Sequence, residues 1–442
     1  MSTERKFYIK PPEYLVDGEP FKNDLFERNL LAERLTSYVN GLNVGCVIGI
    51  DAPWGEGKTY FGRNWEAQLK LEGYKTIYLD AFEQDFTDDP FLLISAEILS
   101  GVKQDEDESW TKFRDACVNA GKVLLPTAAK FTVNTLGKLV LGINDLAEIK
   151  DKFEEIFEEK LGNATEKYVQ KRLKEYDQEK KTVARFKESL EEFATAQEKP
   201  VVFFIDELDR CNPKFAVKMI ERIKHFFDTP NLVFVLLLNR SQLEEAIRGV
   251  YGTIDAHAYL GKFVHFFLSL PKHAPISRYG RNFNRIYCAG LAKRYSYPDS
   301  TEIEAFIDSL GVFASCWKLS LRDLEKAFIY FTIAQPMRRS TPLAAYLLSL
   351  KLYNPALFYD LAKGEIEVHK TLLDMLKPHF DASPDSWELK GIIAFHNCAI
   401  TAPDAFSKEQ ASDLRSFLDS HSLDWKDHLY SVIRRIDTVV VD

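Results

Sequence analysis

A glycine-rich loop between an apolar segment and a potential helix constrains this chain more than any other stretch. Residues 46–60 read Cys-Val-Ile-Gly-Ile-Asp-Ala-Pro-Trp-Gly-Glu-Gly-Lys-Thr-Tyr. The apolar run predicts a buried strand, and Lys58 opens a segment that can be helical. In a phosphate-binding loop of this kind, successive backbone N–H groups and the positive end of the helix face the anion. The expected nucleotide-binding residues are Trp54, Gly55, Glu56, Gly57, Lys58, Thr59 and Tyr60.

Two residues of this loop have distinct expected roles. Lys58 would contact the β- and γ-phosphates of a nucleotide, and the Thr59 hydroxyl would ligate Mg²⁺. The sequence departs from the pattern Gly-x-x-x-x-Gly-Lys-Ser/Thr because Ala52 stands in place of its first glycine. Alanine resists positive φ, so we expect a different or mildly strained turn there. An ordinary Gly-rich strand-to-helix turn is the alternative reading.

A second segment supplies acidic residues. Residues 201–210 read Val-Val-Phe-Phe-Ile-Asp-Glu-Leu-Asp-Arg. The five apolar residues predict a strand buried on both faces of a parallel sheet. Asp206 and Glu207 follow at its carboxyl end, where open α/β sheets bind ligands. Asp206 would hold Mg²⁺ through water, and Glu207 would polarise the attacking water. A strand that ends in a charged turn is the alternative for this segment alone.

Four segments together resemble the KAP family of P-loop NTPases. They are Trp54–Thr59, Tyr78–Glu83, Ile205–Pro213 and Tyr259–Val264, and the resemblance spans about residues 17–331. Asp80 and Phe82 replace the family's commoner Asn and Trp, and Glu207 replaces a commoner Asp without loss of the carboxylate. The resemblance implies ATP and Mg²⁺ as cofactors and slow ATP hydrolysis that is coupled to conformational change.

Four further residues are candidates for the site, Asn239 and Arg322 through the resemblance and Arg210 and Arg240 through their expected place near the carboxyl edge of the sheet. Asn239, after the apolar run 232–238, would orient the attacking water or the γ-phosphate; a polar strand terminus is the alternative. Arg210 and Arg240 are candidates for an arginine finger. Arg322 lies in a block similar to the family's helical lid, although Leu321 replaces a proline there, and it would sense the γ-phosphate. Surface ion pairs are the alternative for all three arginines.

The expected fold is α/β: a parallel P-loop NTPase sheet of about five strands, a helical insertion, a helical lid and an all-α C-terminal region. The insertion is inferred because Lys58 and Asp206 lie much further apart than one βαβ step requires. The expected divisions are 1–100 and 200–271 for the core, 101–199 for the insertion, 272–341 for the lid and 342–442 for the last domain.

Composition limits the class of protein. Hydrophobic content of 46% and charged content of 28% are those of a soluble globular chain, and the net charge of −9 argues against broad nucleic-acid binding. The six cysteines show no metal-ligand spacing, so we expect free thiols in a reducing cytoplasm and no zinc site. The N-terminal residues lack the apolar core of a signal peptide.

Residues 122–145 raise the question of membrane contact. Lys122, Lys130 and Lys138 divide this segment into uncharged runs of about seven residues, whereas a spanning helix needs roughly 18 or more. We expect packing against protein, with attachment to a membrane surface or a span as alternatives.

The function expected from the sequence is Mg²⁺-dependent hydrolysis of ATP, coupled to conformational change or to partner assembly. The helical regions would supply contacts to a protein partner or to another copy of the chain. Some bacterial members of this broad group act in defence against phage or in signalling. Two alternatives stay open: a nucleotide-binding regulatory scaffold with little turnover, which the Ala52 departure keeps in play, and a phosphotransferase.

Overall fold

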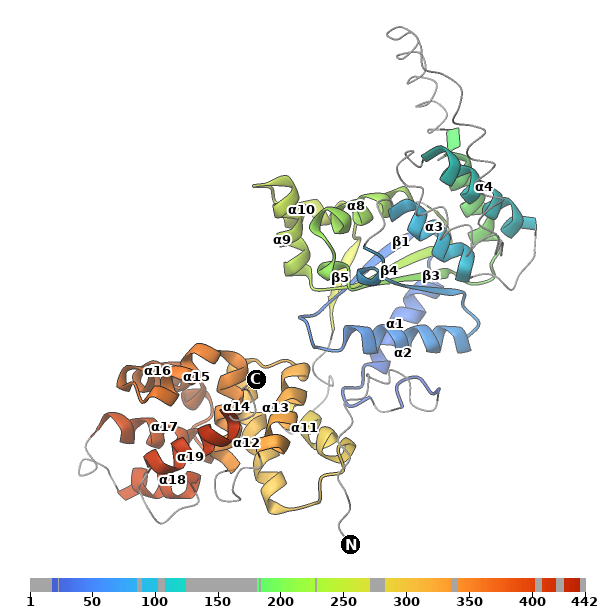
Figure 1. Cartoon of the computed structure of the whole chain (residues 1–442). Helices are drawn as coiled ribbons and strands as arrows, with labels where there is room; N and C mark the ends of the chain where they lie inside the picture. The colour runs from blue at the N-terminus through green and yellow to red at the C-terminus, as the bar shows by residue number, and fades with distance from the viewer. Residues whose placement is uncertain are drawn as a thin grey trace, which may run out of the picture. The chain divides into compact units, whose positions relative to one another are not determined.

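The computed structural model describes residues 18–22, 24–85, 90–101, 108–124, 181–182, 184–226, 229–270, 283–334, 341–401, 408–418 and 425–437. These residues fall into two compact units. The sheet unit lies within residues 13–53 and 58–270, and the helical unit lies within 271–442 and includes residues 54–57. Each unit is described by itself below (Figure 1).

The sheet unit is built on five parallel strands in the order β2-β3-β4-β1-β5. The strands are β1 Cys46–Asp51, β2 Thr76–Asp80, β3 Val201–Asp206, β4 Leu232–Leu238 and β5 Phe266–Ser269. All residues of β3 and β4 are buried, as the continuous apolar runs predict. In this order β4 lies between β1, which precedes the phosphate-binding loop, and β3, which ends in Asp206. The predicted α/β fold with a parallel sheet is confirmed.

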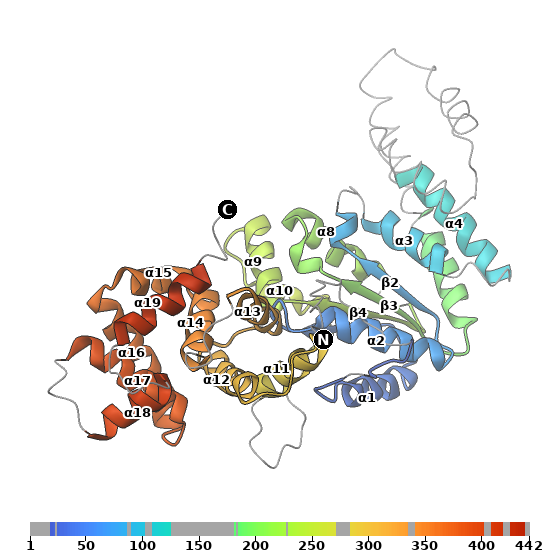
Figure 2. The same ribbon diagram turned by 60° about the horizontal axis from the view of Figure 1, so that its bottom comes forward.

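Alternate residues of each strand enter two different cores, because successive side chains of a strand point to opposite faces. One face packs on α1 (Asn29–Asn40) and α2 (Lys58–Leu71), which Figures 1 and 2 show together on that side. Its strand residues are Cys46, Ile48, Ile50, Val202, Phe204, Val233, Val235 and Leu237. The opposite face carries Val47, Ile77, Leu79, Val201, Phe203, Ile205, Leu232, Phe234, Leu236 and Leu238.

The second face is covered by further helices of the unit. They include α3 Pro90–Gly101, α4 Glu108–Leu124, the helix at residues 184–195, α8 Pro213–Ile223, α9 Arg240–Tyr251 and α10 Ala256–Leu260, with 3₁₀ turns at Phe82–Gln84, Leu208–Arg210 and Lys224–Phe226. Helix α8 begins with Pro213 directly after Asn212, whose side chain accepts a hydrogen bond from the Lys214 N–H. An asparagine cap followed by proline is a favourable helix start.

The helical unit contains α11 Phe283–Arg294, α12 Thr301–Trp317, α13 Leu321–Ala334, α14 Thr341–Tyr353, α15 Pro355–Lys363, α16 Ile366–Ala382, α17 Trp387–Ile400, α18 Lys408–Leu418 and α19 Trp425–Asp437 (Figure 2). One hydrophobic core extends from Cys288 to Ile436 and includes fully buried residues of α12 and α14. The C-terminal region is helical, as predicted. The core crosses residue 341, and the division into a lid and a separate domain stays a prediction.

The expected insertion is only partly described. Its described residues are helical in α4 and at residues 184–195. Most of the 122–145 segment, together with residues 146–180, lies outside the described residues. Within the described part of the chain, no helix combines the length and the apolar character that crossing a membrane requires.

Candidate nucleotide-binding site

The phosphate-binding loop joins β1 to α2, in the predicted order of strand, loop and helix. Gly55 and Gly57 each have φ of +80°, in the left-handed region that glycine adopts without penalty. Ala52 is not among the described residues with positive φ. Its N–H donates to the Leu238 carbonyl at 3.2 Å, which extends the contact between β1 and β4 by one residue. Of the two expectations for Ala52, a different turn or a mildly strained one, the backbone shows no left-handed strain there, and the left-handed turns fall on Gly55 and Gly57.

Lys58, the first residue of α2, places its ammonium group inside the loop. Nζ donates to the carbonyls of Ala52 at 2.8 Å and of Pro53 at 3.3 Å, and the side chain is largely buried. Burial lowers the pKa of Lys58, whereas the carboxylates of Asp209 and Asp206 raise it. A buried ammonium that is held by carbonyl dipoles near carboxylates can exchange those contacts for phosphate oxygens.

Asp206, the last residue of β3, connects three segments. Oδ2 accepts a hydrogen bond from the Tyr78 hydroxyl at 2.8 Å, and Oδ1 accepts one from the Glu207 N–H at 2.8 Å. The Thr59 side chain also hydrogen-bonds this carboxylate. Burial raises the pKa of Asp206, and these three hydrogen bonds oppose that effect. The fold thus brings together Thr59 and Asp206, the two expected metal ligands.

Glu207 has an unusual backbone. Its φ of 59° and ψ of 22° lie in the left-handed region, which costs a non-glycine residue roughly 1–3 kcal/mol. Its Oε2 accepts a hydrogen bond from Arg210 Nη1 at 3.0 Å. Burial raises the pKa of Glu207, and the Arg210 guanidinium lowers it. The expected water-activating carboxylate is therefore held by an arginine three residues later.

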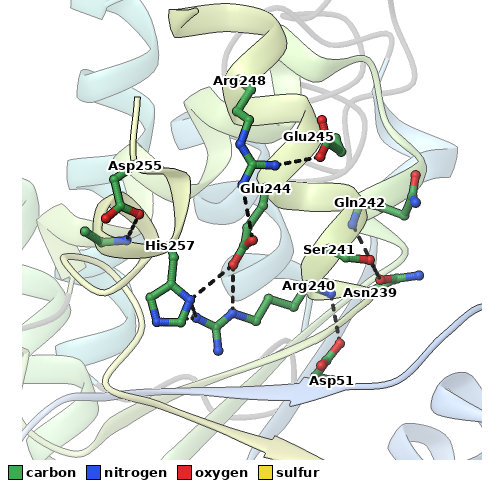
Figure 3. Close-up of polar contacts among 11 residues, drawn as sticks. Asp51, Asn239, Arg240, Ser241, Gln242, Glu244, Glu245, Arg248, Asp255 and His257 are labelled. Carbon is green, nitrogen blue, oxygen red and sulfur yellow. Dashed lines mark hydrogen bonds and ion pairs between the residues drawn. The ribbon is translucent and has the colours of Figure 1, made fainter. Parts of the chain in front are cut away.

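Asn239 follows β4 and caps α9 (Figure 3). Its Oδ1 accepts hydrogen bonds from the Ser241 hydroxyl at 2.8 Å and from the Gln242 N–H. The next N–H, that of Arg240, donates to Asp51 Oδ1 at 2.9 Å, which ties the start of α9 to the end of β1. Asn239 thus lies at the carboxyl edge of the sheet, and its role toward water or phosphate stays a prediction.

The Arg240 side chain is engaged within the sheet unit. Its Nε lies 3.0 Å from a carboxylate oxygen of Glu244, its guanidinium contacts His257, and its Cζ lies 4.5 Å from the centre of the Phe267 ring. Figure 3 shows the contacts of Arg240 with Glu244 on α9 and with His257 on α10. The contacts are those of an intramolecular ion pair. A function as an arginine finger stays a prediction for both Arg240 and Arg210.

The remaining expected residues occupy varied positions. Trp54 is exposed, Glu56 is buried, and Tyr60 lies in the first turn of α2. Arg322 is the second residue of α13 in the helical unit. Their functions stay predictions.

Sequence reasoning assigned no role to Tyr78, although its hydroxyl contacts Asp206. The parallel register pairs Tyr78 with Phe204 and Asp80 with Asp206. The sequence does carry a signal for this contact. Tyr78 lies two residues before Asp80, the acidic end of one predicted strand, and a neighbouring strand ends in Asp206. The Asp80 carboxylate accepts hydrogen bonds from the N–H groups of Phe82 and Glu83, so it stabilises its own turn.

The donor set at the edge of the sheet fits Mg²⁺. A hydroxyl and a carboxylate supply hard oxygen ligands, and Mg²⁺ usually keeps several waters and completes its shell with phosphate oxygens. Among the described residues there is no group of three His, Cys, Asp or Glu side chains that could hold a metal by itself. A site formed by Thr59, Asp206 and a bound nucleotide agrees with both observations.

Comparisons with known proteins identify the family. Curated protein sequences give no significant match to this chain. The solved structure of the Aeropyrum pernix ORC2 protein, in ADPNP-ADP complexes, is similar over 94% of both chains at 13% identity, but its TM-score of 0.33 is too low to support an argument. Residues 28–279 match the KAP family P-loop domain. Because the match covers more than half of the chain, the protein belongs to the KAP family of P-loop NTPases.

Proposed function

We propose that the protein is a Mg²⁺-dependent ATPase that couples ATP binding and hydrolysis to conformational change or to assembly with a partner. The observation that carries the proposal is the meeting of Thr59 and Asp206 at the edge of the sheet, next to the loop that encloses Lys58. A lysine, a hydroxyl and a carboxylate in this arrangement suit a nucleotide polyphosphate and its metal.

Each residue has a defined part in the proposal. Lys58 binds the β- and γ-phosphates, Thr59 and Asp206 hold Mg²⁺, and Asn239 orients water or the γ-phosphate. Bound Mg²⁺ would neutralise charge that develops on the phosphates. Glu207 accepts a proton from the attacking water, and the burial that raises the pKa of Glu207 strengthens it as a base.

One observation favours the second candidate function, a nucleotide-binding scaffold with little turnover. Arg210 Nη1 lies 3.0 Å from Glu207 Oε2, so one oxygen of the carboxylate is engaged in this conformation and the carboxylate is a weaker base. Within the ATPase proposal, the same contact accounts for slow basal turnover that a partner increases. Phosphate release measured with and without partners separates the two candidates.

The cellular setting belongs to the proposal as well. All six cysteines are free and buried, which is compatible with a reducing cytoplasm. The preference for ATP, and a role in defence against phage or in signalling, rest on the family resemblance.

The direct test is a titration of labelled ATP with wild type and Lys58→Ala. Lys58→Ala loses the charge-assisted contact to phosphate, so its affinity for ATP should fall by about 10- to 150-fold or more. Lys70→Ala is the matched control, because Lys70 lies on the same helix, is more than half exposed and pairs with Glu66 at 2.6 Å. Equal ATP affinity in wild type and Lys58→Ala would reject the site. Mg²⁺-dependent phosphate release by wild type then tests hydrolysis.

A further inference from the structure

Tyr78 is the central residue of β2, and its hydroxyl donates to Asp206 Oδ2 at 2.8 Å. The same carboxylate accepts hydrogen bonds from the Thr59 side chain and from the Glu207 N–H. Tyr78 therefore contacts the expected metal ligand Asp206 from β2, whereas Thr59 contacts it from the first turn of α2.

The strand register explains how a tyrosine reaches this carboxylate. Tyr78 is paired with Phe204, and Asp206 is the next residue of β3 on the same face of the sheet. The rings of Tyr78 and Phe204 stack with centroids 5.6 Å apart and planes inclined by 17°. The stacked ring lies alongside β3, and its hydroxyl extends toward the carboxyl end of the strand.

Helix α2 holds the ring from the other side. The Arg63 guanidinium carbon lies 3.6 Å from the centre of the Tyr78 ring, a cation–π contact. A Cβ atom on Gly62 would lie 3.0 Å from the Tyr78 hydroxyl oxygen and 2.2 Å from Leu237 Cδ1, so glycine leaves the space that the tyrosine occupies. Gly62 and Arg63 follow Thr59 by three and four residues, so both lie on the side of α2 that carries Thr59.

These contacts limit the positions that the phenol can adopt. Phe204 and Arg63 lie against the ring, and Asp206 accepts from the hydroxyl. A phenol is protonated at neutral pH, and the Tyr78 hydroxyl donates its hydrogen bond to Asp206 Oδ2.

We propose that Tyr78 is a positioning residue for Asp206: its hydroxyl fixes the carboxylate beside Thr59 and so determines how tightly the site holds Mg²⁺ with a nucleotide. The proposal rests on the metal role of Thr59 and Asp206 given above. Hydrogen-bond partners of metal ligands orient those ligands, and their loss typically weakens metal affinity or activity by 10- to 100-fold.

The test compares Tyr78→Phe with Tyr74→Phe in the full chain. Tyr74 is a matched control, because it is buried in the same unit and donates its hydroxyl hydrogen bond to Asn40 Oδ1 at 3.2 Å, away from the site. The probe is labelled ATP, titrated with Mg²⁺ and separately in EDTA. For Tyr78→Phe we expect a half-saturating Mg²⁺ concentration about 10- to 100-fold higher, with unchanged ATP affinity in EDTA. Tyr74→Phe should match wild type in both measurements.

Arg63→Met provides a second variant that keeps the hydroxyl and loosens the ring. It should raise the half-saturating Mg²⁺ concentration by less than Tyr78→Phe does. Urea unfolding of every variant checks that the fold is kept.

Three results overturn the inference in distinguishable ways. If wild type shows no Mg²⁺-dependent ATP binding, the proposed function fails and the inference fails with it. If wild type depends on Mg²⁺ and Tyr78→Phe behaves like Tyr74→Phe, only the inference fails. If Tyr78→Phe weakens ATP binding equally with Mg²⁺ and with EDTA, Tyr78 is a packing residue and does not position the metal ligand.

Discussion

Arg210 Nη1 lies 3.0 Å from Glu207 Oε2, and both side chains belong to the short turn that follows β3. Glu207 occupies a left-handed backbone conformation there, and the 3₁₀ turn Leu208–Arg210 returns the guanidinium toward it. A carboxylate in this ion pair is a weaker base than a free one, because the arginine stabilises its charged form. The pair therefore joins the residue expected to activate water to a residue considered as an arginine finger.

Arg210 can either restrain Glu207 or act as an arginine finger. Removal of its side chain distinguishes these roles, because phosphate release should rise in the first case and fall in the second. If Arg210 restrains Glu207, Arg210→Ala should raise basal phosphate release by roughly 2- to 5-fold, the equivalent of a partly exposed ion pair of up to about 1 kcal/mol. If Arg210 is an arginine finger, the same variant should lower release by about 10³- to 10⁵-fold.

The control for this experiment is Arg222→Ala. Arg222 is an exposed arginine in the last turn of α8, so its removal changes the net charge by the same amount. Phosphate release that is the same for Arg210→Ala and Arg222→Ala would exclude both roles.

Glu207→Gln should preserve ATP binding and reduce hydrolysis by roughly 10²- to 10⁴-fold, the usual contribution of a general base. Glutamine keeps the size of the side chain but cannot accept a proton from water. Glu245→Gln is the matched control, because Glu245 is an exposed α9 residue that pairs with Arg248. Turnover of Glu207→Gln at the wild-type level would mean that water is activated by another group.

The sequence was sufficient to predict the sheet and the loop, for identifiable physical reasons. Continuous apolar runs such as 201–205 and 232–238 can only be buried on both faces, and β3 and β4 are fully buried. The predicted loop falls between β1 and α2, and its two glycines, Gly55 and Gly57, have left-handed backbone. Thr59 and Asp206 were expected at one site, and the first turn of α2 brings Thr59 to the Asp206 carboxylate at the end of β3.

Features that depend on register or on side-chain partners could not be predicted from one sequence. The contact from Tyr78 to Asp206 requires the pairing of β2 with β3, which no local pattern encodes. Ala52 occupies the position of the first glycine in the phosphate-binding motif, so a different or strained turn was expected there. The backbone instead has positive φ at Gly55 and Gly57. The partner of Arg240 on α9, Glu244, becomes apparent only once the helix is known.

Arg322 is predicted to distinguish ATP from ADP. A guanidinium contact to the γ-phosphate is available with ATP and not with ADP, and it is worth roughly 1.5–3 kcal/mol or about 10- to 150-fold in affinity. Arg322→Ala should therefore bind ADP normally, discriminate poorly between ATP and ADP, and hydrolyse slowly. Arg294→Ala is the control, since Arg294 is an exposed arginine of the same unit that pairs with Glu325 at 3.3 Å. An unchanged ratio of ATP to ADP affinity in Arg322→Ala would make Arg322 an ordinary surface arginine.

The helical unit contains a buried pair of histidines that should make its stability depend on pH. His369 Nδ1 on α16 lies 2.9 Å from His396 Nδ1 on α17, and His396 Nε2 lies 2.8 Å from the Tyr346 hydroxyl on α14. All three side chains are almost completely buried. Two neutral imidazoles can share one proton between facing nitrogens, whereas two protonated rings would direct N–H groups at each other.

Burial lowers the pKa of His369 to about 4, and burial together with His369 lowers the pKa of His396 well below its usual value. The unfolded chain binds these protons near pH 6.5. Because the unfolded state takes up protons at a higher pH than the folded state, the free energy of unfolding falls as the pH drops through 6.5, until the pH nears 4. For His369 alone, the loss between pH 7 and pH 5 should be roughly 2 kcal/mol.

Urea unfolding of the full chain at pH 7 and pH 5 measures this loss. His369→Gln should be less stable than wild type at pH 7, because a buried contact is lost, but its stability should fall less between the two pH values. His379→Gln, a change to a partly exposed histidine on the same helix, should keep the wild-type pH dependence. If His369→Gln loses as much stability as wild type between pH 7 and pH 5, other groups, such as His396 or carboxylates that protonate on acidification, carry the acid sensitivity, and His369 has no part in it.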